Sequence, residues 1–124
     1  MILGIGIDMI EVERIAAKIN KENGFRELVF SKNEIDYCEA KANKFEHYGA
    51  RFAAKEAFLK AVGTGWINGS SFHEIEITKD EHGKPELILL GETAITFQHL
   101  NIKKISVSLS HLKSIASAVV VIEN

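Results

Sequence analysis

The segment at residues 2–8, ILGIGID, alternates apolar side chains with glycine, and it restricts the possible folds more than any other stretch of this chain. Alternation of this kind predicts a short buried strand. Gly4 and Gly6 leave one side of the strand without side chains, so another backbone or a ligand can approach it closely. We therefore expect this strand to lie where a second segment or a bound molecule comes into close contact.

The remaining sequence predicts helices and largely antiparallel strands in mixed order. Ser31 followed by Glu34 is a capping-box pattern, and the glycines after Val62 supply the backbone conformations that a helix end requires. Helices are expected at residues 9–20, 31–43, 44–62 and 91–101, a hairpin at 73–90, and two further strands at 104–124 with a bend near 110–113. This order indicates a compact α+β fold in which residues 1–124 form a single domain.

The composition argues against several classes of protein. Fifteen Lys and Arg against 17 Asp and Glu give a net charge of −2, which provides no general reason to expect nucleic acid or a membrane as partner. The single cysteine, Cys38, allows neither an intramolecular disulfide nor a cysteine zinc cluster. The apolar start lacks the basic residues of a signal peptide, and no stretch of about 18 apolar residues occurs. We expect a cytoplasmic protein.

Asp8 directly follows the apolar strand, where a charge without a partner is costly. Considered alone, this position slightly favours Asp8 as the N-cap of the next helix over Asp8 as a metal ligand. A second acid close to it in space would reverse that preference. Glu56 is the candidate for this second acid.

Glu56 and Lys60 lie one helical turn apart in the expected long helix. They can form an exposed ion pair worth only about 0.2–0.5 kcal/mol, or they can face a bound anion, with Glu56 acting through a divalent metal and Lys60 directly. The spacing leaves both interpretations open. Small neighbours favour close packing of this helix on a sheet or a narrow cleft: Ala53, Ala54, Ala57 and Ala61.

Histidines and basic residues give weaker signals. For His111 a surface or hydrogen-bonded role is favoured two to one, and Ser110 beside it in a strand points to the opposite face. The other histidines show no metal-ligand spacing and are interpreted as surface residues: His47, His73, His82 and His99. Basic residues recur along three helices and form either a solvated face or docking surfaces for an acidic protein and for phosphates: Arg14, Lys18, Lys21, Lys41, Lys44, Arg51, Lys55 and Lys60.

Taken together, these elements resemble the holo-acyl-carrier-protein synthases, the small bacterial type of 4'-phosphopantetheinyl transferase. The combination of a strand-end GIGxD with a helical AAKEAxxKAxGxG is specific, whereas each fragment alone is weak. The matching stretches keep their order and spacing over essentially the whole chain: GIGIDMIEVERI (4–15), FSKNEIDYCEAK (30–41), RFAAKEAFLKAVGTG (51–65), HGKPELILLG (82–91) and SVSLSHLKSIASAVVVIE (106–123).

The resemblance implies transfer of 4'-phosphopantetheine from coenzyme A to a serine of apo-acyl carrier protein, in support of fatty acid biosynthesis. It also implies a homotrimer with each site between two subunits. Asp8 and Glu56 would bind Mg²⁺, and Lys60 would neutralise charge on the leaving phosphate. Further roles follow by position: Lys44, Arg51, Gly63, Gly65, Ser110 and His111 in coenzyme A binding, and Arg14, Lys18 and Lys21 in docking the carrier protein.

The proton of the carrier serine needs an acceptor, and Glu56 is the first hypothesis, directly or through metal-bound water, with Asp8 second. Two alternatives remain at this stage. One is another Mg²⁺-dependent phosphoryl or nucleotidyl transferase that uses the same three residues. The other is a trimeric binding module without activity, in which Glu56 and Lys60 are only an ion pair.

Overall fold

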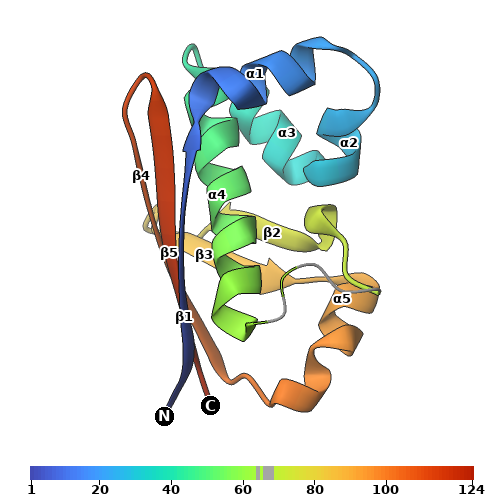
Figure 1. Ribbon diagram of the computed structural model, residues 1–124, viewed down its shortest axis with the longest axis vertical. Helices are drawn as coiled ribbons and strands as arrows, with labels where there is room; N and C mark the ends of the chain where they lie inside the picture. Colours follow the sequence, from blue (N-terminus) through green and yellow to red (C-terminus); the bar gives the residue numbers. More distant parts are fainter. Residues whose placement is uncertain (64, 66–68) are drawn as a thin grey trace.

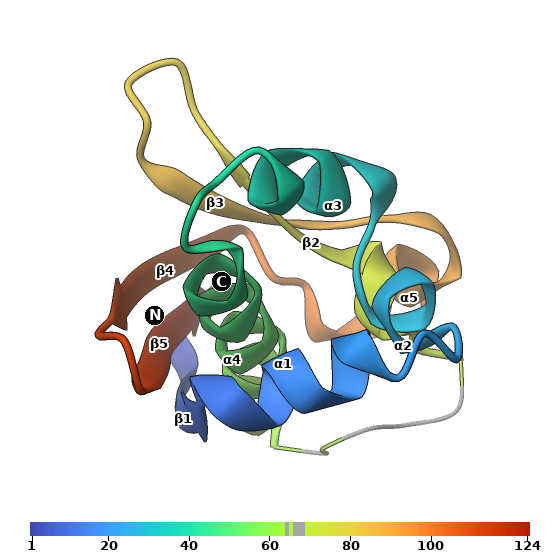
Figure 2. The same cartoon turned by 90° about the horizontal axis from the view of Figure 1, so that it is seen from above.

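The computed structural model describes residues 1–63, 65 and 69–124. A long helix, α4 (Lys44–Val62), lies between an antiparallel three-stranded sheet on one side and a hairpin with the shorter helices on the other (Figures 1 and 2). The sheet has the order β1-β5-β4, with β1 at Ile2–Glu11, β5 at Ile115–Glu123 and β4 at Lys104–His111. This arrangement confirms the α+β prediction and the packing of the long helix on a largely antiparallel sheet.

The other elements surround the free sides of α4. The helices are α1 (Val12–Asn20), α2 (Phe25–Val29), α3 (Lys32–Glu39) and α5 (Gly91–Thr96), and the hairpin consists of β2 (Ile75–Lys79) and β3 (Pro85–Leu89). Short 3₁₀ turns at Phe72–Glu74 and Gln98–Leu100 complete the set. In Figure 1, α1, α2 and α3 gather at one end of α4, and α5 lies at the other end.

The two glycines of β1 allow α4 to pack directly on the strand backbone. A Cβ atom built on Gly4 would lie 1.9 Å from the carbonyl oxygen of Ala61, and one on Gly6 would lie 1.8 Å from that of Ala57. Any side chain larger than hydrogen would therefore push the helix away. The close approach predicted from the alternating glycines is confirmed, and the approaching segment is a helix backbone.

Most of α4 is buried, because the sheet covers one side and the hairpin and α3 cover another. Its small residues Ala53, Ala54 and Ala57 pack in one core with Val120 and Ile122 of β5. A helix that is buried on several sides needs small residues where backbones come close and large apolar ones elsewhere. The sequence pattern of α4 is therefore explained by its central position.

Several element boundaries differ from the predictions. The first strand continues to Glu11, so the following helix begins at Val12, and its N-cap is Glu11. Pairing with β5 along the whole of β1 extends the strand beyond its apolar pattern. Helix α2 was missed, since it has only five residues, and the helix expected at 31–43 ends at Glu39. The capping box of Ser31 and Glu34 is confirmed.

Glu34 has a second role that the capping pattern does not reveal. Its carboxylate Oε1 lies 2.7 Å from Nζ of Lys55, and both side chains are fully buried. The same ammonium donates to the carbonyl oxygens of Phe72 and Ile75, and the backbone N–H of Ile77 donates to Glu34 Oε2. Lys55 thus joins α4 to α3 and β2, and its assignment to a solvated or docking face was wrong.

The outer face of β1 is apolar and exposed. Ile5, Ile7 and Met9 alternate with the inward-facing positions of β1 and are largely accessible. Shallow depressions on this face are lined by Ile7 and Met9 together with residues of β4 and β5. Among the described residues, no helix combines the length and the apolar character that crossing a membrane requires.

Candidate active site

Asp8 lies inside β1, on the side of the strand that faces α4. Its Oδ1 accepts a hydrogen bond from Nζ of Lys60 at 3.0 Å, and the same ammonium donates to the carbonyl oxygen of Ile7 at 3.0 Å. The N-cap interpretation of Asp8 is therefore wrong, because the strand continues for three residues past it. Within the described part of the chain, the ion pair of Lys60 is with Asp8 and not with Glu56.

Glu56 is half-buried beside this pair. Burial raises the pKa of its carboxyl group, and the negative charge of Asp8 raises it further, whereas Lys60 and Lys18 lower it. Asp8 and Lys60 are therefore near enough to Glu56 for their charges to act on its carboxyl group. Asp8 from β1 and Glu56 and Lys60 from α4 thus form one cluster.

The cluster offers the oxygen ligands that Mg²⁺ prefers. Asp8 and Glu56 are two carboxylates, and no set of three or more His, Cys, Asp or Glu suited to a metal occurs among the described residues. Mg²⁺ in phosphate-handling sites is commonly held by one or two carboxylates, with water and substrate phosphates as the other ligands. The donor set therefore fits an ion that is bound together with a phosphorylated substrate.

A second polar site lies around Arg51, at a cavity of about 150 Å³. Arg51 is 3% exposed, its guanidinium carbon lies 4.2 Å from the centre of the Tyr37 ring, and its Nε has no hydrogen-bond partner in the described part of the chain. Lys79 also lies over the Tyr37 ring, at 4.8 Å. Burial raises the pKa of Tyr37, but the hydrogen bond from Lys79 and the nearby cations outweigh it and lower the pKa. The positive charge at this cavity suits an anion.

Two histidines line the same cavity. Nδ1 of His111 lies 2.8 Å from Oε1 of Glu46, and its ring is 5.0 Å from that of His47. Burial lowers the pKa of His47, and the charges of His111 and Arg51 lower it further. His47 is thus a half-buried residue that lines a cavity, a role that its sequence position did not predict.

Three residues of this cavity were missed by the sequence reasoning. His47 and Arg51 lie one turn apart on α4, and that spacing was a signal that could have linked them. Tyr37 comes from α3 and Lys79 from β2, and no local pattern connects either of them to Arg51. Only the packing of α3 and the hairpin on α4 brings them together.

The two sites lie on different sides of α4. Arg51 and Lys60 are about two and a half helical turns apart, so their side chains leave the helix in opposite directions. Figure 2, which looks along α4, shows β1 on one side of the helix and α3 with the hairpin on the other. A single chain therefore presents the acidic cluster and the basic cavity as separate sites.

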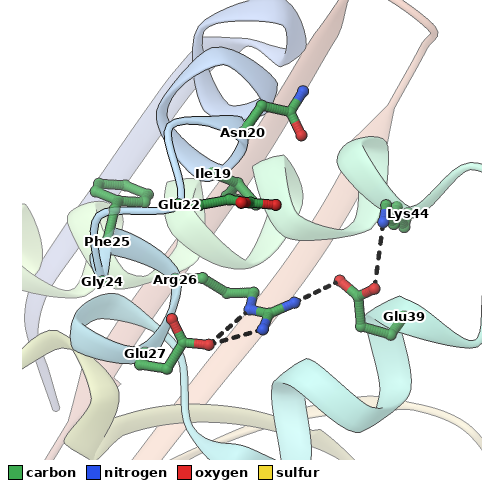
Figure 3. Close-up of a pocket in the computed structure, with 9 residues that line it drawn as sticks. All are labelled: Ile19, Asn20, Glu22, Gly24, Phe25, Arg26, Glu27, Glu39 and Lys44. Carbon is green, nitrogen blue, oxygen red and sulfur yellow. Dashed lines mark hydrogen bonds and ion pairs between the residues drawn. The ribbon is translucent and has the colours of Figure 1, made fainter.

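Lys44 belongs to neither site. Its Nζ lies 3.2 Å from Oε1 of Glu39, which also pairs with Arg26 and accepts a 2.6 Å hydrogen bond from the hydroxyl of Tyr48. Figure 3 shows these charged groups linked in a chain along a cavity of about 300 Å³ between α1, α2 and the start of α4. The structure does not bring Lys44 together with Arg51 and His111.

The remaining candidates are distributed over the surface. Ser110 is exposed on the outer sheet face, whereas His111 beside it faces Glu46, as the strand alternation predicts. Gly63 caps α4 with a φ of 82°, and Gly65 has a φ of 62°, while Thr64 between them lies outside the described residues. Arg14 and Lys18 are exposed on α1 and Lys21 directly after it, and Lys18 is near enough to Glu56 to affect its pKa.

Known proteins match this chain over nearly its whole length. A model of the 4'-phosphopantetheinyl transferase superfamily matches residues 4–120. A holo-[acyl-carrier-protein] synthase from Cytophaga hutchinsonii is 48% identical over 122 residues, which cover 97% of this chain and 96% of that protein.

Solved structures agree with this match. The holo-[acyl-carrier-protein] synthase of Neisseria meningitidis has a TM-score of 0.88 at 35% identity, and the match covers 100% of both chains. That of Bacillus anthracis, in complex with CoA (3',5'-ADP), has a TM-score of 0.80 at 39% identity and covers 98% of this chain and 96% of that one. The fold and the family model thus agree with the sequence resemblance, and the chain belongs to the 4'-phosphopantetheinyl transferase superfamily.

Proposed function

We propose that this protein is a holo-acyl-carrier-protein synthase, which transfers 4'-phosphopantetheine from coenzyme A to a serine of apo-acyl carrier protein and releases adenosine 3',5'-bisphosphate. The name of the Cytophaga relative and the CoA complex of the Bacillus anthracis protein support this reaction. The observation that carries the proposal is the convergence of Asp8, Glu56 and Lys60 between β1 and α4. The family match to residues 4–120 supports a single transferase domain over residues 1–124.

Asp8 and Glu56 would hold Mg²⁺. The hydrogen bond from the ammonium of Lys60 to Asp8 supports this assignment, because it shows that the Asp8 carboxylate already binds a cation. When bound, the metal ion would supply positive charge to the diphosphate of coenzyme A.

The protein's own residues would supply the remaining chemistry. Transfer of this kind needs positioning and charge neutralisation more than covalent help, and Lys60 would neutralise the charge that grows on the leaving phosphate. Glu56 would accept the proton that the carrier serine hydroxyl loses, with Asp8 as the second candidate. Burial and the charge of Asp8 raise the pKa of Glu56, which makes its carboxylate a better proton acceptor than an exposed glutamate.

The basic cavity would bind another phosphate of coenzyme A. Arg51 contributes a buried guanidinium whose Nε has no hydrogen-bond partner among the described residues, and Lys79 and His111 line the same space. Guanidinium groups suit phosphate because their planar array of N–H donors matches its oxygens. Lys79, and not Lys44, would contribute the lysine to this phosphate site, because Lys44 is paired with Glu39 outside the cavity.

A homotrimer with sites between subunits would unite the two sites. Within one chain the acidic cluster and the basic cavity lie on different sides of α4, so one extended substrate would contact the cluster of one subunit and the cavity of its neighbour. The exposed apolar face formed by Ile5, Ile7 and Met9 supports such an assembly, because exposed apolar patches of this kind mark interaction surfaces.

The carrier protein would dock on α1. Arg14, Lys18 and Lys21 are exposed there and would attract an acidic partner. The effect of Lys18 on the pKa of Glu56 supports this location, because it indicates that Lys18 lies near the proposed proton acceptor.

Intact-protein mass spectrometry tests the reaction. Apo-acyl carrier protein incubated with coenzyme A, Mg²⁺ and this protein is expected to gain about 340 Da, the mass of one phosphopantetheine group transferred with its phosphate. Omission of Mg²⁺ should abolish the gain. A carrier protein whose mass stays unchanged under all conditions would contradict the proposed function.

A further inference from the structure

The ammonium of Lys60 occupies the carboxylate that is proposed to bind metal. Nζ lies 3.0 Å from Oδ1 of Asp8 and 3.0 Å from the carbonyl oxygen of Ile7. The side chain of Asp8 is only 17% exposed, whereas that of Lys60 is 55% exposed. A largely buried anion therefore receives its counter-ion from a flexible side chain that extends in from solvent.

This cluster needs a cation whether or not metal is present. Asp8 and Glu56 repel each other when both are ionised, and burial adds to the cost of holding two negative charges together. The cations that act on Glu56 in this region are Lys60 and Lys18. Of the two, Lys60 makes the direct ion pair with Asp8. A metal ion that approached Asp8 would therefore be repelled by the ammonium of Lys60.

We propose that Lys60 is the internal counter-cation of the metal-free site. A divalent ion must displace the Lys60 ammonium from Asp8 before Lys60 can contact the substrate phosphate. This inference rests on the proposed function, because it takes Asp8 and Glu56 as the metal ligands. Lys60 then has two alternative partners, Asp8 without metal and substrate phosphate with it. Its long, exposed side chain permits the exchange without any change of backbone.

The exchange couples two binding events. A phosphate that draws Lys60 away from Asp8 leaves that carboxylate unneutralised, which strengthens metal binding. A divalent ion on Asp8 in turn releases Lys60 toward phosphate. Because such coupling is reciprocal, metal and phosphate must each raise the affinity of the other. In the absence of phosphate, the metal competes with Lys60 and binds more weakly than two carboxylates alone would allow.

Titration with Mn²⁺, followed by electron paramagnetic resonance of the free ion and without coenzyme A, tests this competition. Lys60→Met and Lys60→Gln remove the charge but keep much of the side-chain length, and both should bind Mn²⁺ roughly three- to tenfold more tightly than the wild type. Lys60→Arg keeps the charge and should bind as the wild type does. Lys32→Met is the matched control, since Lys32 also pairs with an aspartate at 3.0 Å, Asp36, and its removal should leave Mn²⁺ affinity unchanged.

The metal site itself is tested separately by Asp8→Asn and Glu56→Gln. If both variants bind Mn²⁺ as the wild type does, or if no variant binds it at all, the proposed metal site is wrong and the inference falls with it. If these variants lose Mn²⁺ while Lys60→Met and Lys60→Gln bind it no more tightly than the wild type, only the role of Lys60 is overturned. Circular dichroism confirms that each variant is folded, as the exposure of Lys60 leads us to expect.

Discussion

Glu56 lies where burial and a neighbouring carboxylate act on the same group, and both raise its pKa. A residue in such surroundings is a candidate proton acceptor, because perturbed carboxyl groups gather at sites of proton transfer. Glu56→Gln keeps the shape of the side chain but removes the charge. We expect kcat to fall by roughly a hundredfold or more, measured by carrier-protein mass change at saturating Mg²⁺.

Glu86→Gln is the control for this substitution, because it removes an exposed carboxylate from β3, away from the cluster. Its turnover should match that of the wild type. A Glu56→Gln variant with nearly unchanged kcat would remove Glu56 from the mechanism and leave Asp8 as the proton acceptor.

His47 connects the basic cavity to the pH dependence of stability. Burial and nearby positive charges lower its pKa below the ordinary value of 6.5. At a pH just below 6.5, His47 is therefore protonated to a greater extent in the unfolded chain than in the folded one. The contribution of neutral His47 is complete above pH 6.5 and is lost as the pH falls through the lower, folded pKa. Between about pH 7.5 and about pH 5, the urea midpoint of the wild type should drop more than that of His47→Gln; equal drops would contradict this.

At the level of elements, the contact between β1 and α4 sets the position of the acidic cluster. Gly6 lies two residues before Asp8, and a Cβ on it would lie 1.8 Å from the carbonyl oxygen of Ala57. Gly6→Ala should therefore lower the free energy of unfolding by at least about 2 kcal/mol, measured by urea denaturation. It should also weaken catalysis, since Asp8 and Lys60 belong to the two elements that are forced apart.

Gly83→Ala is the control that separates the steric clash expected at Gly6 from the general cost of replacing a glycine. Gly83 has a φ of 82°, but apart from Gly83 itself and its two chain neighbours no described atom lies within 4 Å of a Cβ built there. Its replacement should cost only about 1 kcal/mol and leave the cluster intact. Similar losses of stability for the two variants would show that the close approach at Gly6 is not the cause.

At the level of the whole molecule, the two sites on different sides of α4 suggest a test of shared sites. A mixture of two inactive variants regains activity only if each site combines Glu56 of one subunit with His111 of another. After unfolding and refolding together in equal amounts, Glu56→Gln and His111→Ala should recover about one quarter of the wild-type sites, because only one of the four subunit combinations supplies both residues.

The same variants refolded separately and then mixed without exchange are the control, and they should stay inactive. A mixture that remains inactive after refolding together would indicate that one chain supplies both residues. Light scattering of the refolded mixture establishes whether the expected trimer has formed.

Much of the architecture follows from local patterns in the sequence. The bare face of the first strand, the long alanine-rich helix, the capping box at Ser31 and the hairpin were all predicted, because strand and helix periods determine which side chains share a face. The resemblance of five ordered stretches likewise identified the family. Short helix α2 and the end of β1 were not predictable in this way, because they depend on pairing and packing with distant segments.

The charge partners of Lys60 and Lys55 depend on the tertiary structure. From spacing, Lys60 was a partner for Glu56 and Lys55 a surface residue, yet Lys60 contacts Asp8, 52 positions away, and Lys55 is buried against Glu34. A charged side chain can be paired by any opposite charge that folding brings near it, and sequence separation carries no information about that distance. For the same reason, the sequence did not predict that Tyr37 and Lys79 line the same cavity as Arg51. Local periodicity therefore determined the elements and their faces, whereas packing between them determined the chemistry of both sites.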